Sequence, residues 1–141
     1  MKRKEQLIRL SKDHHQSLVL AKKCINTHAS NDADLIALLC QSIVESFDAV
    51  WEKHFVIEEE GVFKQATAYS DQLNSLCQQL IDEHRQLRSL KENMARGDYS
   101  CLGEFGEILK RHTRVEEREL FPLVEHSFSE TELELVRVLS E

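Results

Sequence analysis

The sequence predicts an all-α protein: an antiparallel up-and-down four-helix bundle with a short extra helix at the C-terminus. Apolar residues recur at steps of three and four along most of the chain, which is the spacing of one face of a helix. The 141 residues include one proline and four glycines, so few positions interrupt a helix. This length suits one domain, and no linker or low-complexity stretch divides it, so we expect residues 1–141 to form a single domain.

The first helix is expected over residues 3–28. The segment ASNDAD at 29–34 follows, and its residues favour helix ends and N-caps. A second helix should then run to about Gln65. It contains Gly61, which costs roughly 1 kcal/mol relative to Ala, so an earlier end is also possible.

The third and fourth helices have clearer ends. Ser70 is a good N-cap for the third helix, and Gly97 is well suited to end it. The fourth helix carries Leu102 and should end near His126. The segment SETE at 129–132 has the form of a capping box and opens the short last helix. Short connections between long helices favour an antiparallel bundle.

Composition limits the classes of partner. The formal net charge is −7, which argues against a nucleic-acid partner. No apolar run approaches the length of a membrane span, and the charged N-terminus lacks the apolar core of a signal peptide. We therefore expect no nucleic acid, no membrane segment and a cytoplasmic location.

The four cysteines lie within or beside apolar stretches, and none forms a CxxC or CxxH pair. A zinc finger or a thioredoxin-like site is therefore unexpected. We expect small core residues, with a redox role for one of them left open, at Cys24, Cys40, Cys77 and Cys101.

Histidines recur on the apolar faces of three helices. His54 follows Val50 and Trp51 by four and three residues, so it should point to the core. Glu58 lies one turn further along the same face. A lone inward histidine is usually an ordinary core residue, so the question is whether several converge.

The later helices repeat this arrangement. His84 lies on an apolar stripe between Leu80 and Leu87, and His112 and Glu116 share a stripe in the fourth helix. At about 1.5 Å per residue, the predicted turns place His54, His84 and His112 at one level of the bundle. Because a buried carboxylate is costly without a partner, two of them beside inward histidines indicate a bound cation.

The first helix offers His14 and His15. His14 lies nearer the centre of the apolar stripe, so periodicity alone does not decide between them. Internal comparison favours His15, because the apolar residues that follow it match those that follow His84 at the same offsets: Leu18, Ala21 and Ile25 against Leu87, Leu90 and Met94. We predict His15 as the ligand, with His14 supporting it or facing solvent.

The pattern is a doubled unit, His-x-x-Leu on one helix and His-x-x-x-Glu-Glu on the next. A doubled unit predicts a site with near two-fold symmetry, and four histidines with two carboxylates suit two metal ions. Glu59 and Glu117 lie about 100° further round their helices, so we expect them to be more exposed and dispensable. A metal-free bundle with incidental histidines is the alternative.

The segments SKDHHQSL, HFVIEEEGVF, DEHRQL and HTRVEERELFP together resemble those of the hemerythrin-like, or HHE cation-binding, family. The resemblance implies a four-helix bundle holding two non-haem iron ions with a bridging oxo or hydroxo group, for which zinc could substitute. Carried over by position, the metal ligands are His15, His54, Glu58, His84, His112 and Glu116.

The sequence departs from the invertebrate oxygen carriers of that family. Arg88 stands where they have a second histidine on the third helix, and His112-x-x-x-Glu116 replaces their His-x-x-x-x-Asp. The set looks more like the bacterial iron-centre repair and nitric-oxide-related members, although their separate cysteine-bearing N-terminal domain has no counterpart here.

The resemblance implies a protein that binds metal and a small ligand (dioxygen, nitric oxide or peroxide) for sensing, binding or iron handling. Nitrogen-rich ligation with only two carboxylates favours binding over vigorous oxidation. The alternative is an enzyme that reduces nitric oxide or peroxide, or that acts in repair of iron–sulfur centres. No motif marks a substrate pocket or an electron-partner site, so enzymatic turnover is the less favoured interpretation, and any protein partner is unknown.

Overall fold

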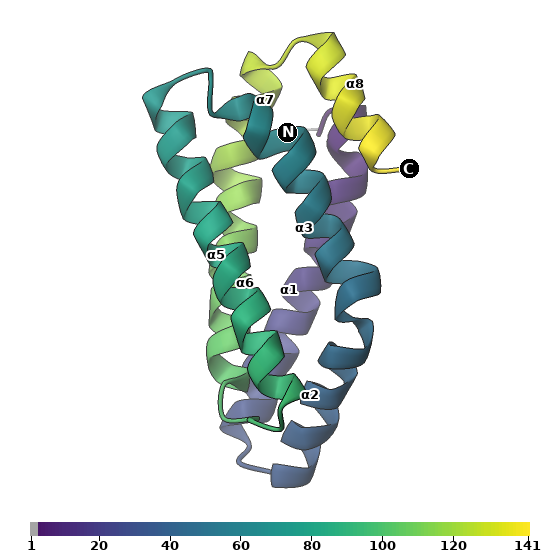
Figure 1. Cartoon of the computed structure of the whole chain (residues 1–141), viewed down its shortest axis with the longest axis vertical. Helices are drawn as coiled ribbons and strands as arrows, with labels where there is room; N and C mark the ends of the chain where they lie inside the picture. Colours follow the sequence, from purple (N-terminus) through teal and green to yellow (C-terminus); the bar gives the residue numbers. More distant parts are fainter. Residues whose placement is uncertain (1–2) are drawn as a thin grey trace.

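The computed structural model describes residues 3–141, and all the regular secondary structure in this range is helical. The predicted all-α class is therefore confirmed. Figure 1 shows long helical rods side by side, with a shorter helix, α8, crossing one end. Rods that follow one another along the chain run in opposite directions in this view.

The rods are built from consecutive helical segments, some of which are 3-10 or π turns and are labelled η. The first rod contains η1 (Glu5–Leu7) and α1 (Ile8–Ala29). The second rod contains α2 (Ala33–Phe47), η2 (Asp48–Glu52), α3 (Lys53–Ile57), η3 (Glu58–Phe63) and α4 (Lys64–Ala66). The third rod is α5 (Asp71–Ala95), and the fourth contains α6 (Leu102–Val115), η4 (Glu116–Leu120) and α7 (Phe121–Ser127). The short helix α8 (Glu130–Leu139) follows the fourth rod.

The predicted caps form. Asp32 accepts hydrogen bonds from two backbone N–H groups at the start of α2, and Ser70 accepts one at the start of α5. Ser129 and Glu132 form a reciprocal capping box at the start of α8. Gly97 has φ +91°, a backbone conformation that favours glycine, just after α5 ends.

The second rod differs from the regular helix that the sequence predicts. It contains two π-helical segments, η2 and η3, and the fourth rod contains a third, η4. Val50 lies in η2 and is 44% exposed, although α-helical periodicity places it on the inward stripe. The wider π turn changes which residues face inward, whereas Trp51 stays buried.

Two apolar clusters divide the core along its length. The first is built from α1, α2, α5 and α6 and includes Phe47, Leu87 and Phe105. The second lies toward α8 and includes Leu80 and Phe121. The six buried histidines and glutamates that form the centre described below lie where these clusters meet. Along the chain, His14, His84, His112 and Glu116 fall between members of the two clusters, whereas His54 and Glu58 flank the junction at Phe55 and Ile57.

The four cysteines are free and buried within these clusters, as expected for core residues. Burial raises the pKa of the Cys24 thiol to about 12 and that of the Cys40 thiol to about 11. The thiolate is the reactive form, so both groups stay protonated and inert at neutral pH.

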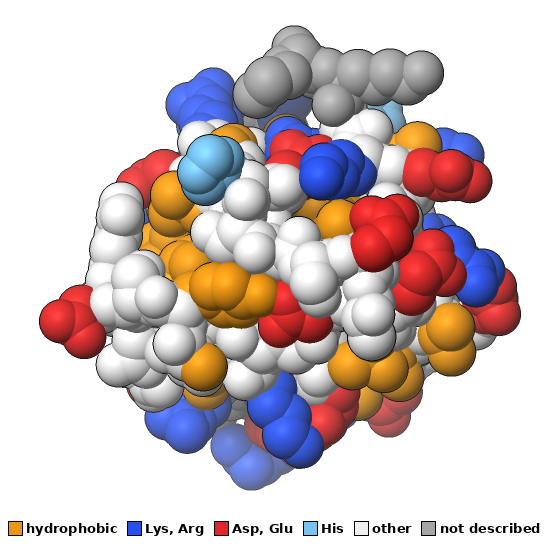
Figure 2. Space-filling model, turned by 90° about the horizontal axis from the view of Figure 1, so that it is seen from above, with side chains coloured by type: hydrophobic (Ala, Val, Ile, Leu, Met, Phe, Trp, Pro, Cys, Tyr) orange, Lys and Arg blue, Asp and Glu red, His pale blue; other side chains and the backbone are white. Residues whose placement is uncertain are grey.

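The C-terminal helix α8 packs across the end of the second rod. Gly61 lies in η3, and a Cβ atom at this position would lie 3.1 Å from Leu139 and 3.5 Å from the Cα atom of Val136. Gly61 therefore allows α8 to approach the backbone of η3 closely. Figure 2 looks onto this end of the molecule, where small apolar patches lie between acidic and basic side chains. None of the helices described in residues 3–141 is long and apolar enough to cross a membrane.

The contact between α1 and α6 gives a test of packing. A Cβ at Gly106 would lie 2.8 Å from Cys24 Cβ and 2.9 Å from the carbonyl oxygen of Ala21, so Gly106→Ala should destabilise the fold by about 1–3 kcal/mol. A Cβ at Gly103 meets only the ring of His28, which is exposed and can turn away. Gly103→Ala is the matched control and should be neutral or stabilising. Urea unfolding measures both, and equal destabilisation would contradict the packing argument.

Candidate metal centre

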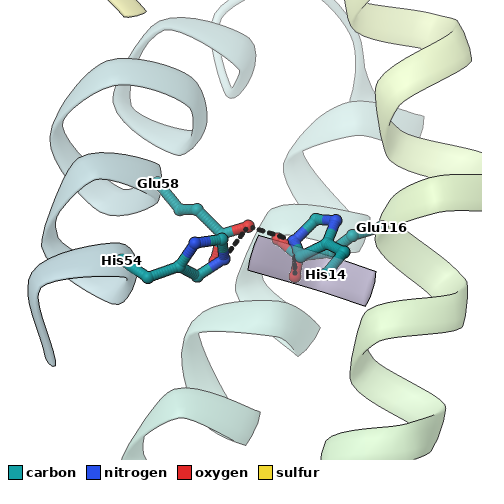
Figure 3. Close-up of side chains that lie close together, drawn as sticks. All are labelled: His14, His54, Glu58 and Glu116. Atoms are coloured by element: carbon teal, nitrogen blue, oxygen red, sulfur yellow. Dashed lines mark hydrogen bonds and ion pairs between the residues drawn. The ribbon is translucent and has the colours of Figure 1, made fainter. Parts of the chain in front are cut away.

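Each of the four rods places one histidine in the layer between the two apolar clusters. His14 lies on α1, His54 on α3, His84 on α5 and His112 on α6, and all four are buried. Glu58 and Glu116, which open the π-helical segments η3 and η4, are fully buried in the same layer. These six side chains enclose a common centre (Figure 3 shows four of them).

The structure places His14, not His15, in this layer. His14 is 2% exposed and belongs to a buried stripe of α1, at Leu10, His14, Ser17, Ala21 and Cys24. His15 is exposed and lines a groove on the outer surface of α1. The prediction that His15 points inward is wrong because it relied on matching Leu18, Ala21 and Ile25 to the residues after His84, and Leu18 and Ile25 are only half-buried.

The other five predicted residues converge as expected from their spacing. Two clusters of possible ligand atoms form, each within a span of 4.8 Å, and both contain Glu58 and Glu116. One cluster adds His14 and His54, and the other adds His84 and His112. The two sets of donors therefore share their carboxylates.

Glu58 faces both histidine pairs with separate oxygens. Its Oε2 lies 3.1 Å from Nε2 of His14 and 3.2 Å from Nε2 of His54, and its Oε1 lies 3.1 Å from Nε2 of His84. Glu116 Oε1 lies 2.8 Å from Nε2 of His112 and 3.2 Å from Nε2 of His14. Both carboxylates thus lie in positions from which they could bridge two cations.

Two observations show that the donor set suits a cation. Both carboxylate oxygens of Glu116 are buried without a hydrogen bond, although imidazole nitrogens lie close to one of them. The Nε2 atoms of His84 and His112 also face each other at 3.0 Å. Buried polar atoms normally have partners, and a positive ion bound between these atoms would satisfy all of them. Imidazole nitrogen and carboxylate oxygen are ligands that iron and zinc accept.

In each of the four inward histidines, Nδ1 points away from the centre and faces a carboxylate, which we call an outer carboxylate. The distances from Nδ1 to oxygen are 2.7–3.0 Å in the pairs His14–Glu117, His54–Asp13, His84–Glu59 and His112–Glu83. Facing a carboxylate, Nδ1 carries the proton and donates it. An imidazole that is neutral and held in this way directs the lone pair of Nε2 toward the centre, as a metal ligand requires.

Glu59 and Glu117 are more exposed than Glu58 and Glu116, as expected, but their contacts argue against their being dispensable. Both are half-buried and accept hydrogen bonds from His84 and His14. In each His-x-x-x-Glu-Glu segment, the first glutamate faces the centre and the second reaches a histidine of the next rod. A π turn begins at the first glutamate in both cases, and such turns are frequent at functional sites.

Asp13 and Glu83 were missed from the sequence. Each directly precedes an inward histidine, and each accepts the Nδ1 proton of a histidine on the next rod. The signal was present: Asp13-His14 and Glu83-His84 are the two places where an acidic residue directly precedes one of these histidines. Aligning Asp13-His14 with Glu83-His84, instead of aligning the apolar residues that follow, selects His14 as the counterpart of His84.

Charge in the layer is balanced by protons when no metal is bound. Burial disfavours the charged form of His54, but Glu58 and Asp13 outweigh it and raise the pKa of His54 to about 9. Burial likewise opposes, and Glu116 outweighs, the charge on His14 and His112, whose pKa values are raised. Burial favours the neutral form of Glu58, but His54 and its other partners hold the pKa of Glu58 well below its usual range. Glu58 therefore stays ionised and attracts positive charge.

Comparison with known proteins agrees with this chemistry. The family model of the hemerythrin HHE cation-binding domain matches residues 6–124, which include all six central side chains and all four outer carboxylates. No curated protein and no solved structure gives a significant match. With most of its length matched and a buried cluster of histidines and glutamates compatible with a metal site, the chain belongs to the hemerythrin HHE cation-binding family.

Proposed function

We propose that the chain is one domain, an up-and-down four-helix bundle that holds two non-haem iron ions and binds dioxygen or nitric oxide, for sensing, binding or iron handling. The observation that carries this proposal is the pair of donor clusters that share two carboxylates. The proposed ligands are His14, His54, Glu58, His84, His112 and Glu116.

The proposed division of ligands follows the two clusters. His14 and His54 would hold one ion, and His84 and His112 the other, with Glu58 shared between them. Iron bound here supplies reversible coordination of a small ligand and one-electron chemistry. Two imidazoles and two shared carboxylates leave coordination positions for that ligand at each ion. Zinc would accept the same donors and could replace iron.

The way in which the protons of the site are held favours reversible binding of a small ligand over multiple-turnover reduction. Reduction of nitric oxide or peroxide consumes protons, which a general acid near the reacting atoms supplies. Each of the four imidazoles already donates its Nδ1 proton to a carboxylate. Aromatic rings cover them, with Phe55 stacked on His84 at 4.0 Å and Phe121 on His14 at 5.1 Å. The histidines therefore hold and orient, and none is free to act as an acid.

Metal analysis with an optical spectrum of the protein purified in air tests the proposal. We expect two irons per chain and a charge-transfer spectrum of a coupled iron pair. Anaerobic titration of the reduced protein with nitric oxide or dioxygen should then give stoichiometric binding. Rapid multiple turnover with excess reductant would instead favour the reductase alternative, and a chain that takes up no metal would refute the proposed centre.

The choice between neighbouring histidines gives a sharp prediction. His14→Ala removes a donor from one cluster and should lose most of the metal at that position, whereas His15→Ala alters an exposed side chain and should bind metal as the wild type does. Metal content by mass spectrometry of the native protein measures the difference, with circular dichroism to confirm helical folding. Metal loss in the His15 variant alone would restore the sequence-based assignment.

Two outer carboxylates, Glu59 and Glu117, should contribute to metal affinity because they accept the Nδ1 protons of His84 and His14. Glu59→Gln and Glu117→Gln each replace a charged acceptor of an Nδ1 proton and should weaken metal binding about 10–100-fold. Glu60→Gln and Glu119→Gln are matched controls on the same helical turns, because both side chains are exposed. Competition with a chelator measures the affinities. Equal affinity in all four variants would mean that the outer bonds do not support the ligands.

A further inference from the structure

Two arginines make similar contacts on the two halves of the centre: each binds two glutamates and lies over a phenylalanine ring. Resting on the proposed metal site, we infer that Arg3 and Arg88 are positioning residues: each holds one outer glutamate, and through it one histidine, in the orientation that a metal ion requires. Arg3 and Arg88 lie one step further from the centre than the ligands and the outer carboxylates.

Arg88 lies on α5 and binds two glutamates of the second rod. Its Nη1 and Nη2 donate to the two carboxylate oxygens of Glu59 at 2.9 and 3.2 Å, and its Nε donates to Glu52 at 2.8 Å. Glu59 Oε2 in turn accepts the Nδ1 proton of His84 at 2.7 Å. The guanidinium also lies 5.5 Å from the ring of Phe55, the ring that stacks on His84. Arg88 therefore fixes both the hydrogen-bond partner and the aromatic neighbour of one histidine.

Arg3 repeats these contacts for the opposite histidine. Its Nη2 donates to Glu117 Oε2 at 2.9 Å, and its Nη1 donates to Glu125 at 2.7 Å. Glu117 Oε1 accepts the Nδ1 proton of His14 at 2.8 Å. The guanidinium lies 5.4 Å from the ring of Phe121, which stacks on His14. Both halves thus contain an arginine with two glutamates, a phenylalanine and a histidine.

The likeness is not a by-product of the doubled sequence unit. Arg3 precedes η1 near the start of the chain, whereas Arg88 lies in the middle of α5. Phe55 comes three residues before the inward glutamate of its rod, and Phe121 comes five residues after the corresponding Glu116. Two unlike local sequences therefore produce one arrangement, which indicates that the arrangement itself is required.

The remaining outer carboxylates are held less firmly. Arg111 reaches Glu83 with a single contact at 3.2 Å, and Arg9 reaches Asp13 at 3.7 Å, each from a side chain that is more than half exposed. The side chains of Arg88 and Arg3 are 29% and 22% exposed, and each binds two carboxylates. The forked guanidinium of Arg88 fixes the plane of the Glu59 carboxylate as well as its charge. Arg3 binds one carboxylate oxygen and the backbone carbonyl of Glu117. Loss of either arginine should therefore release the glutamate and then the imidazole.

Titration of the metal-free protein with Co(II), in competition with a chelator, measures the affinity of each of the two metal-binding steps. Arg88→Gln should weaken one of the two binding steps about 10-fold and leave the other unchanged, and Arg3→Gln should do the same through the other half. Arg85→Gln is the matched control, because Arg85 lies on α5 and contacts only exposed Asp82. In the zinc-loaded protein, the Nδ1–H resonance of His84 should broaden in the Arg88 variant while that of His14 stays sharp.

The outcomes are distinct. Equal weakening of both steps would indicate general destabilisation and would overturn the inference, as would unchanged affinity and unchanged Nδ1–H signals in both variants. If either variant does not fold, the other still tests its own half. A wild-type chain that binds fewer than two cobalt ions would refute the proposed two-metal centre itself, independently of the arginines.

Discussion

Two carboxylates buried in the middle of an apolar core are the constraint on which the rest of this structure depends. Glu58 and Glu116 are fully buried between two clusters of apolar side chains. Buried charge is costly unless it is compensated. Every other polar group in the layer serves that compensation: four imidazoles face the two carboxylates, and outer carboxylates keep the imidazoles oriented.

The outer hydrogen bonds also tie the rods to one another in a closed ring. Asp13 joins the first rod to the second, Glu59 the second to the third, Glu83 the third to the fourth, and Glu117 the fourth back to the first. Apolar packing alone tolerates small shifts of one helix along another. A ring of charged acceptors at one level does not, so the same bonds that orient the ligands define the register of the helices.

The helical class, the turns and their caps could be read from the sequence because they depend on local signals, such as Ser70 at an N-cap and the capping box at Ser129. Five inward side chains followed from periodicity. Periodicity placed His14 nearer the centre of the stripe, but the comparison with the apolar residues after His84 selected His15. That comparison fails because the buried stripe of α1 includes the polar Ser17, which bonds to Thr113 on α6 at 2.9 Å. The role of Glu59 could not be predicted either, since regular α-helical geometry turns it away and the π turn beginning at Glu58 has no evident sequence signal.

The close approach of α8 to Gly61 links the end of the chain to its centre. Residues 130–139 lie beyond the part that the family model matches, yet α8 rests on the π turn that begins with Glu58. A side chain at position 61 would push α8 away, and a bulkier residue at Val136 would press on the turn that carries Glu58 and Glu59. Substitutions in the terminal helix and in the π turn of the family domain therefore affect each other through this contact.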